Sequence, residues 1–157
     1  MNMVIPKTIH KNSVHPDSVR MRGHHLLCML GWKGVGYTPA FTINYNKIIE
    51  RLKTETVTIE IIEGKDDICA PLNSENYEGY HCEDEDVLIR DKKALDDINR
   101  TLGLNLTIGS QFEISEIYLA DMRALFQKYE IRSACAGCSW HDFCSDIAAD
   151  NFKDTKL

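Results

Sequence analysis

Apolar residues recur at helical spacing after Thr38 and Pro39, a pair that is typical of a helix N-cap and first turn. This spacing predicts a helix with one buried face. The residues of that face are Phe41, Tyr45, Ile48, Ile49 and Leu52.

Two later stretches also predict helices. Asp91 is expected to cap the first of them, and Gly103 suits the position just after its end. Its buried positions are Leu95, Ile98 and Leu102. The second helix is expected from about Ser115 to Tyr129. Its apolar stripe consists of Ile114, Tyr118, Met122, Leu125 and Tyr129.

The segment ETVTIEII alternates polar and apolar residues with a period of two, which predicts a half-buried strand. A single strand is not stable alone, so we expect partners in residues 19–22 and in LTIGSQF. The apolar positions of the expected sheet are Val57, Ile59, Ile61, Leu106, Ile108 and Phe112. Together these elements predict an α+β fold, mostly helical, with a small β-sheet.

Length and composition are those of one globular domain. The chain has 157 residues, of which 43% are hydrophobic and 27% charged. Residues 1–18 contain two prolines and no periodicity, so we expect a loose leader followed by a single cysteine-rich domain at 19–157. No stretch has the apolar run of a signal peptide or a membrane span, and the expected location is cytoplasmic.

The charge balance disfavours one class of partner. Eighteen Lys and Arg residues against 24 Asp and Glu residues give a net charge of -6, and no basic cluster interrupts this balance. Because binding to phosphates requires a basic face, we expect no nucleic acid partner. A redox or other protein partner, not a membrane, remains the expectation, and the sequence does not identify it.

Six cysteines in a chain without an export signal favour metal or redox chemistry over disulfides. The tail cysteines, Cys135, Cys138 and Cys144, form a C-x2-C-x5-C pattern in CAGCSWHDFC. Two residues between thiolates allow both to bind one ion, a spacing shared by zinc sites, iron-sulfur sites and thioredoxin-like pairs. The loop cysteines, Cys69 and Cys82, lie in an irregular acidic segment at about 64–86.

We predict that four of these five cysteines hold a metal ion or cluster. His81, next to Cys82, is a further candidate ligand, and Arg22 and Arg132 are candidate cations for a negatively charged site. The alternative is a set of unrelated, buried thiols.

The segment RGHHLLC adds three more candidates. If residues 23–30 are helical, His24 and Cys28 lie at i and i+4, and His25 and Cys28 at i and i+3. Such a helix could present an imidazole and a thiol to one ion, or a nucleophilic Cys28 with His24 or His25 as its base. The third interpretation is that the leucines form core and the histidines bond at its edge.

The chain resembles the domain-of-unknown-function 1284 family of small bacterial and archaeal proteins. The resemblance covers about residues 20–145 and rests on RGHHLLCMLGWKGVGYTPAF, DDICAP, HCEDEDVLIRD and CAGCSW, ending at Cys144. Residues that match the family's motifs are Arg22, Gly23, His24, His25 and Cys28, then Cys69, Cys82, Cys135, Cys138 and Cys144. The resemblance implies an iron-sulfur cluster. It also implies a second loop cysteine before a proline, a place that Leu72 takes here.

Three functions stay open at this point. The first is an iron-sulfur protein that transfers electrons or senses redox state. The second is a structural zinc site in an interaction module. The third is an enzyme that uses Cys28 with His24 or His25. The sequence gives neither a substrate nor an oligomeric state.

Overall fold

The structure of the chain is a computed structural model that describes residues 18–54, 57–114 and 116–157. The predicted leader lies, apart from residue 18, outside these ranges. None of the helices within them is both long and apolar enough to cross a membrane.

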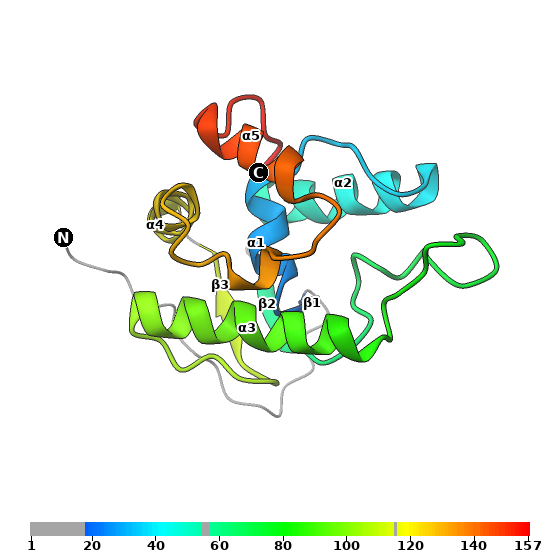
Figure 1. Cartoon of the computed structure of the whole chain (residues 1–157), viewed down its shortest axis with the longest axis horizontal. Coiled ribbons are helices and arrows are strands. Elements are labelled where there is room, and N and C mark those ends of the chain that lie inside the picture. Colours follow the sequence, from blue (N-terminus) through cyan, green and yellow to red (C-terminus); the bar gives the residue numbers. More distant parts are fainter. Residues whose placement is uncertain (1–17, 55–56, 115) are drawn as a thin grey trace.

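Three short strands form a mixed sheet at the centre of the fold (Figure 1). Strand β1 (Val19–Arg22) pairs in parallel with β2 (Thr58–Ile62), which pairs antiparallel with β3 (Gln111–Glu113). In the register, Val19 lies opposite Ile59, and Ile59 lies opposite Phe112. All three side chains are fully buried, which anchors the sheet in the core.

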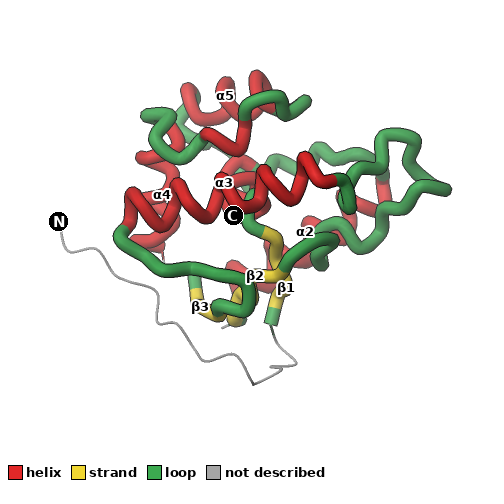
Figure 2. Tube along the Cα trace, turned by 60° about the horizontal axis from the view of Figure 1, so that its bottom comes forward, coloured by secondary structure: helices red, strands yellow, loops and turns green. Residues whose placement is uncertain are grey.

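Helices pack against this sheet, and Figure 2 shows the three strands gathered on one side of them. The helical elements are α1 (His25–Cys28), η1 (Met29–Gly31), α2 (Pro39–Thr54), α3 (Glu85–Leu102), α4 (Glu116–Gln127), η2 (Ser133–Cys135) and α5 (His141–Ala149). The prediction of a mostly helical α+β fold with a small sheet is therefore confirmed.

The predicted helix after Pro39 is confirmed as α2. Its first turn is capped by Thr38, whose Oγ1 accepts a hydrogen bond from the Phe41 N–H at 3.1 Å. Tyr45 stacks on Trp32 with the ring centroids 3.9 Å apart. The buried face consists of Phe41, Tyr45, Ile48 and Ile49, while Leu52 is only partly buried.

The expectation that Asp91 caps a helix is wrong. Helix α3 begins at Glu85, with Asp84 at the N-cap, so Asp91 lies two turns inside it and is buried. Acidic residues in the first turn, Glu85 and Asp86, stabilise the earlier start. The predicted end is confirmed, because Gly103 follows the helix in the left-handed conformation with φ 66°.

Three other local predictions also change. LTIGSQF is a strand only at its end: Gly109 turns the chain with φ 92°, and the side chain of Ile108 is 47% exposed. Helix α4 ends at Gln127, because the chain reverses at Tyr129, which has φ 61° and is 60% exposed. The segment 23–30 is α-helical only over α1 and then tightens into η1. The sequence did not predict α5.

Candidate metal centre

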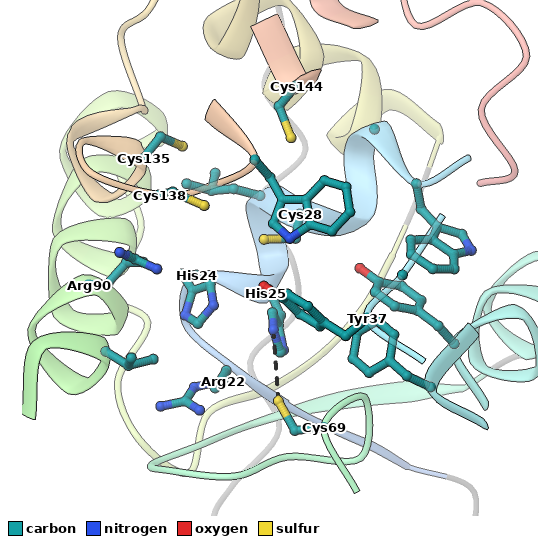
Figure 3. A pocket seen from close by; sticks show the side chains of 18 of the residues that line it. Arg22, His24, His25, Cys28, Tyr37, Cys69, Arg90, Cys135, Cys138 and Cys144 are labelled. Atoms are coloured by element: carbon teal, nitrogen blue, oxygen red, sulfur yellow. Dashed lines mark hydrogen bonds between the residues drawn. The ribbon is translucent and has the colours of Figure 1, made fainter. Parts of the chain in front are cut away.

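A cavity of about 110 Å³ lies where the end of β1, the loop between β2 and α3, and the segment from η2 to α5 meet (Figure 3). All six cysteines line it, as do four histidines. These residues are Cys28, Cys69, Cys82, Cys135, Cys138, Cys144, His24, His25, His81 and His141. Loop and tail cysteines, far apart in sequence, therefore face one space.

The turn between β1 and α1 sets the position of both histidines of RGHHLLC. Gly23 lies so close to α3 that a Cβ atom there would be 2.4 Å from the backbone oxygen of Asp91. Only glycine permits this approach without a shift of backbone. Helix α3 thereby packs directly against the start of α1.

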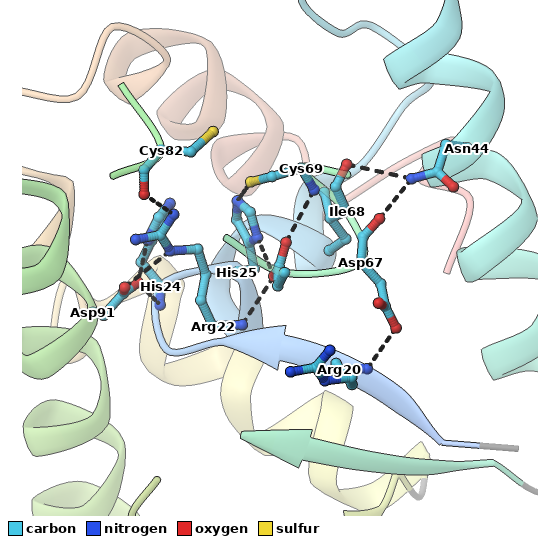
Figure 4. A network of polar contacts seen from close by, with 11 residues as sticks. Arg20, Arg22, His24, His25, Asn44, Asp67, Ile68, Cys69, Cys82 and Asp91 are labelled. Carbon is cyan, nitrogen blue, oxygen red and sulfur yellow. Dashed lines mark hydrogen bonds and ion pairs between the residues drawn. The ribbon is translucent and has the colours of Figure 1, made fainter. Parts of the chain in front are cut away.

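Because α3 lies so close to the turn, the carboxylate of Asp91 can accept hydrogen bonds from it (Figure 4). Its Oδ2 accepts a hydrogen bond from Arg22 Nε at 2.9 Å, and its Oδ1 accepts the His24 N–H at 3.1 Å. The Nδ1 atom of His24 lies 2.5 Å from the same Oδ1. Arg22 also donates from Nη1 to the Cys82 carbonyl at 2.8 Å, so one buried cation ties β1 to α3 and to the loop.

The network fixes the charge of its members. Burial, followed by the neighbouring His25, lowers the pKa of His24 to about 4, which leaves its imidazole neutral near pH 7. Burial alone would raise the pKa of Asp91, but the hydrogen bonds that it accepts from His24 and the charge of Arg22 outweigh it and lower the pKa. Asp91 is therefore a carboxylate paired with a buried guanidinium.

His25 has an acidic partner of its own. Its Nδ1 lies 2.6 Å from Asp66 Oδ2, and its Nε2 lies 4.0 Å from Cys69 Sγ. Burial would raise the pKa of Asp66, but His25 and the backbone N–H groups of Arg22 and Cys69 lower it to about 2. One ligand atom from each of His25, Asp66 and Cys69 lies within 4.8 Å of the other two, and all three residues are buried. This group could hold a metal ion.

The loop cysteines interact with each other. Both residues are buried, and the neighbouring Cys82 thiol, together with burial, raises the pKa of Cys69. The Cys69 thiol in turn lowers the pKa of Cys82 to about 6, and the charge of Arg22 lowers it further. The pair therefore carries one proton and one negative charge near pH 7.

The tail cysteines gather instead around Cys28 (Figure 3). Burial, and then the thiols of Cys144, Cys138 and Cys135, raise the pKa of Cys28. Burial, followed by the thiols of Cys135 and Cys138, raises the pKa of Cys144 to about 11. Successive turns place them, since the Cys138 N–H donates to the Cys135 carbonyl at 3.1 Å and the Cys144 N–H to the Trp140 carbonyl at 2.9 Å.

Cations lie beside this second group, which contains Cys28 and the tail cysteines. Arg132 is 6% exposed, donates from Nη1 to Ser145 Oγ at 2.9 Å, and lowers the pKa of Cys135 against the larger effect of burial. Arg90, on α3, extends toward Cys138 in Figure 3. The six thiols thus form two groups at two ends of one cavity.

Some of these residues could not be identified from the sequence. Asp66 has only the sequence DDIC to suggest it, and Asp91 is better explained locally as a helix cap. Arg22 and Arg132, considered as cations for the site, are both buried beside thiols. His81 lines the cavity with its Nδ1 2.6 Å from the Gly79 carbonyl.

Comparison with known families assigns the chain. The family described as "Protein of unknown function (DUF1284)" matches residues 36–144, which is more than half of the chain. The protein belongs to the DUF1284 family. No curated protein and no solved structure matches it.

The matched range includes most of the cysteines that line the cavity of this DUF1284 protein. It contains both loop cysteines and all tail cysteines, and the RGHHLLC segment precedes it. Leu72, at the place where the family resemblance implies a cysteine, is 2% exposed and lines the cavity. Its N–H donates to the Cys69 carbonyl at 2.8 Å, so this position lies one tight turn from a loop thiol.

Proposed function

We propose that this DUF1284 protein binds an iron-sulfur cluster through Cys28, Cys135, Cys138 and Cys144, and that it transfers electrons or senses redox state. The observation that carries the proposal is the convergence of these thiols at one end of the cavity, each within electrostatic reach of others in the group. Four thiolates are the ligand set of both [2Fe–2S] and [4Fe–4S] clusters.

The spacing of the sulfurs supports a cluster over a single ion in this group. Sulfurs bound to one tetrahedral zinc lie about 3.8 Å apart, given a Zn–S bond of about 2.3 Å. Within the described ranges, no three of the cysteine sulfurs lie within 4.8 Å of one another. A cluster places inorganic atoms between its cysteine ligands and so accepts wider spacing, and the cavity offers about 110 Å³.

The surroundings also suit a negatively charged cluster. Thiolate ligation of iron and sulfide leaves net negative charge, which nearby cations and N–H groups stabilise. Arg132 and Arg90 provide the cations, since both lower the pKa of Cys135. When bound, the cluster would supply a one-electron redox centre.

The partial exposure of the tail cysteines favours exchange of electrons with another molecule. All three are partly exposed, as is Cys28. Beside them Trp140 packs against Tyr37 and Phe143, with ring centroids 5.6 and 5.5 Å away, and Phe143 is 39% exposed. A cluster held here would lie near the surface behind an aromatic rim, where a redox partner could approach.

The enzyme alternative with a nucleophilic Cys28 has less support. A nucleophilic cysteine needs a depressed thiol pKa, whereas burial and three neighbouring thiols raise the pKa of Cys28. The Nδ1 atoms of His24 and His25 are engaged by Asp91 and Asp66.

Anaerobic purification tests the proposal. The protein is expected to be brown, to contain iron and acid-labile sulfide in equal amounts, and to give an electron paramagnetic resonance signal after reduction with dithionite. Cys138→Ala should lose iron and sulfide together. Colourless wild-type protein that contains zinc at the tail cysteines and no sulfide would refute it.

A further inference from the structure

We propose that the cavity also binds a small organic anion, a carboxylate with a flat aromatic body, at the end that contains Arg22 and the loop cysteines. Three features of the cavity walls point to such a ligand: the sign of their charges, polar atoms without partners, and a group of aromatic rings. The proposal does not depend on the cluster, because it concerns other side chains and is tested by direct binding.

The side chains of Asp, Glu, Lys and Arg that line the cavity are all of one sign. They are Arg22, Lys33 and Arg90, and no Asp or Glu is among the described residues of the lining. The chain as a whole has the opposite balance, with 24 acidic and 18 basic residues. A cleft lined by one sign of charge focuses the electric field and raises the local concentration of ions of the other sign. The cavity therefore favours an anion over a neutral or cationic ligand.

Two of these cations are not neutralised by an acidic neighbour. Lys33 and Arg90 are partly buried, and neither forms an ion pair with an acidic side chain in the described part of the chain. Figure 3 shows the guanidinium of Arg90 directed from α3 toward His24. The positive charge of these two side chains is therefore available to an anion in the cavity.

Arg22 contributes a hydrogen-bond donor, because Asp91 already balances its charge. Its Nε donates to Asp91 at 2.9 Å and its Nη1 to the Cys82 carbonyl at 2.8 Å. Nη2 is buried and has no hydrogen-bond partner within the described ranges, although the side chain lines the cavity. Buried donors in proteins nearly always have a partner, and an exception calls for one such as an ion or a ligand. A carboxylate oxygen would form a strong, charge-assisted hydrogen bond with Nη2.

Tyr45 provides a second polar atom without a partner. Its hydroxyl is buried, has no hydrogen-bond partner among the residues that the structure describes, and belongs to a side chain that lines the same cavity. The ring is held in place by Trp32, on which it stacks with the centroids 3.9 Å apart and an interplanar angle of 7°. The hydroxyl therefore has a fixed position from which it can donate to an oxygen of the ligand.

Aromatic walls and a limited volume define the body of the ligand. Tyr37 packs against two other rings of the lining, with centroid distances of 5.1 Å to Tyr77 and 5.6 Å to Trp140. Flat apolar groups pack well against such rings. A cavity needs roughly 10–15 Å³ to hold one water molecule. The volume of about 110 Å³ therefore has room for an acid of the size of benzoate and is too small to enclose a nucleotide.

Calorimetric titration of the full-length, anaerobically purified protein with benzoate tests the site. Benzoate is expected to bind once per chain. Benzamide, which has the same shape and no charge, should bind about 10-fold more weakly or worse, because hydrogen bonds between charged groups contribute on that order. Acetate, which lacks the ring, and inorganic phosphate, a compact anion, should also bind more weakly than benzoate by about 10-fold or more.

Four variants test the roles of the side chains, each checked for folding by circular dichroism. Arg22→Lys keeps the charge but has no second terminal nitrogen, so it should weaken benzoate binding about 10-fold. Arg90→Gln should weaken it about 5-fold through loss of a nearby charge, and Tyr45→Phe about 3-fold through loss of the hydroxyl. Lys92→Gln is the matched control and should leave binding unchanged, because Lys92 is on the same helix as Arg90, is 79% exposed and does not line the cavity.

The cluster is tested separately on the same samples, through their iron and sulfide contents. Cys138→Ala, which should lack the cluster, is expected to bind benzoate at least as tightly as the wild type, because a negatively charged neighbour is removed. Loss of benzoate binding in this variant would contradict a site that is independent of the cluster.

Specific results would overturn the proposal. One is the absence of saturable benzoate binding to the folded wild-type protein. Another is benzamide or phosphate binding as tight as that of benzoate, since the cavity would then not select an organic anion. A third is an affinity for benzoate that is unchanged in Arg22→Lys, Arg90→Gln and Tyr45→Phe, which would place the ligand outside the cavity.

Discussion

The buried ion pair between Arg22 and Asp91 should be among the most sensitive points of the fold. Arg22 and Asp91 side chains are only 1% and 8% exposed, and the Nε–Oδ2 distance is 2.9 Å. Asp91→Leu removes the carboxylate and leaves a guanidinium buried without its charge partner. Loss of one partner from a buried pair costs about 3–5 kcal/mol. We expect that reduction in the free energy of unfolding.

A surface pair on the same helix provides the matched control. Lys92 Nζ and Asp96 Oδ2 are also 2.9 Å apart, but their side chains are 79% and 62% exposed. Asp96→Leu should therefore reduce the free energy of unfolding by no more than about 0.5 kcal/mol from loss of the pair. A double variant, Arg22→Met with Asp91→Leu, should be more stable than Asp91→Leu alone, because it leaves no unpaired charge.

Urea unfolding of metal-depleted proteins, followed by circular dichroism in one buffer, measures all three variants and the wild type against the same reference. The reasoning is refuted if Asp91→Leu loses less than about 1 kcal/mol. It is also refuted if the double variant is less stable than the single one, since the cost would then arise from lost packing and not from the unpaired charge.

Two further predictions concern the same region. The pKa of His24 is about 4 in the folded protein and 6.5 in the unfolded chain, so the unfolded chain binds a proton first as the pH falls. The free energy of unfolding should therefore decrease by up to about 3 kcal/mol between pH 6.5 and pH 4. In His24→Gln, the urea midpoint should change less over this pH range. Gly23→Ala should reduce the free energy of unfolding by about 1–3 kcal/mol, because its Cβ atom would lie 2.4 Å from the Asp91 backbone oxygen. Gly31→Ala is the control and should be nearly neutral, because the nearest atom to its Cβ would be 3.5 Å away. Equal losses in thermal unfolding of the two variants would contradict the packing argument.

Local patterns in the sequence predicted the elements that local physics determines. The alternation that contains Ile59 and the Thr38–Pro39 start of α2 each specify an element through its own residues, and both predictions are confirmed. Asp91 shows the limit of this approach. A buried aspartate inside a helix and a capping aspartate look alike in sequence. The ion pair with Arg22, which lies in a strand 69 residues earlier in the chain, distinguishes them.

The site was harder to predict for the same reason. The sequence identified all six cysteines and the two histidines of RGHHLLC as candidates, because their residue types and spacing carry the chemistry. It placed four of the five loop and tail cysteines at one metal centre, a ligand set that stays a prediction. Cys28 was considered with the histidines beside it, whereas the fold brings it to the tail cysteines through contacts between η1, α4 and α5.

The division of thiols into two groups is the central claim, and the cluster content of two variants tests it most directly. Iron and acid-labile sulfide should be determined per folded chain in anaerobically purified Cys28→Ala and Cys69→Ala. The account predicts that Cys28→Ala loses the cluster and that Cys69→Ala retains it at the wild-type level. A cluster that persists in Cys28→Ala and disappears in Cys69→Ala would show that the loop and tail cysteines share one centre, and would contradict the account.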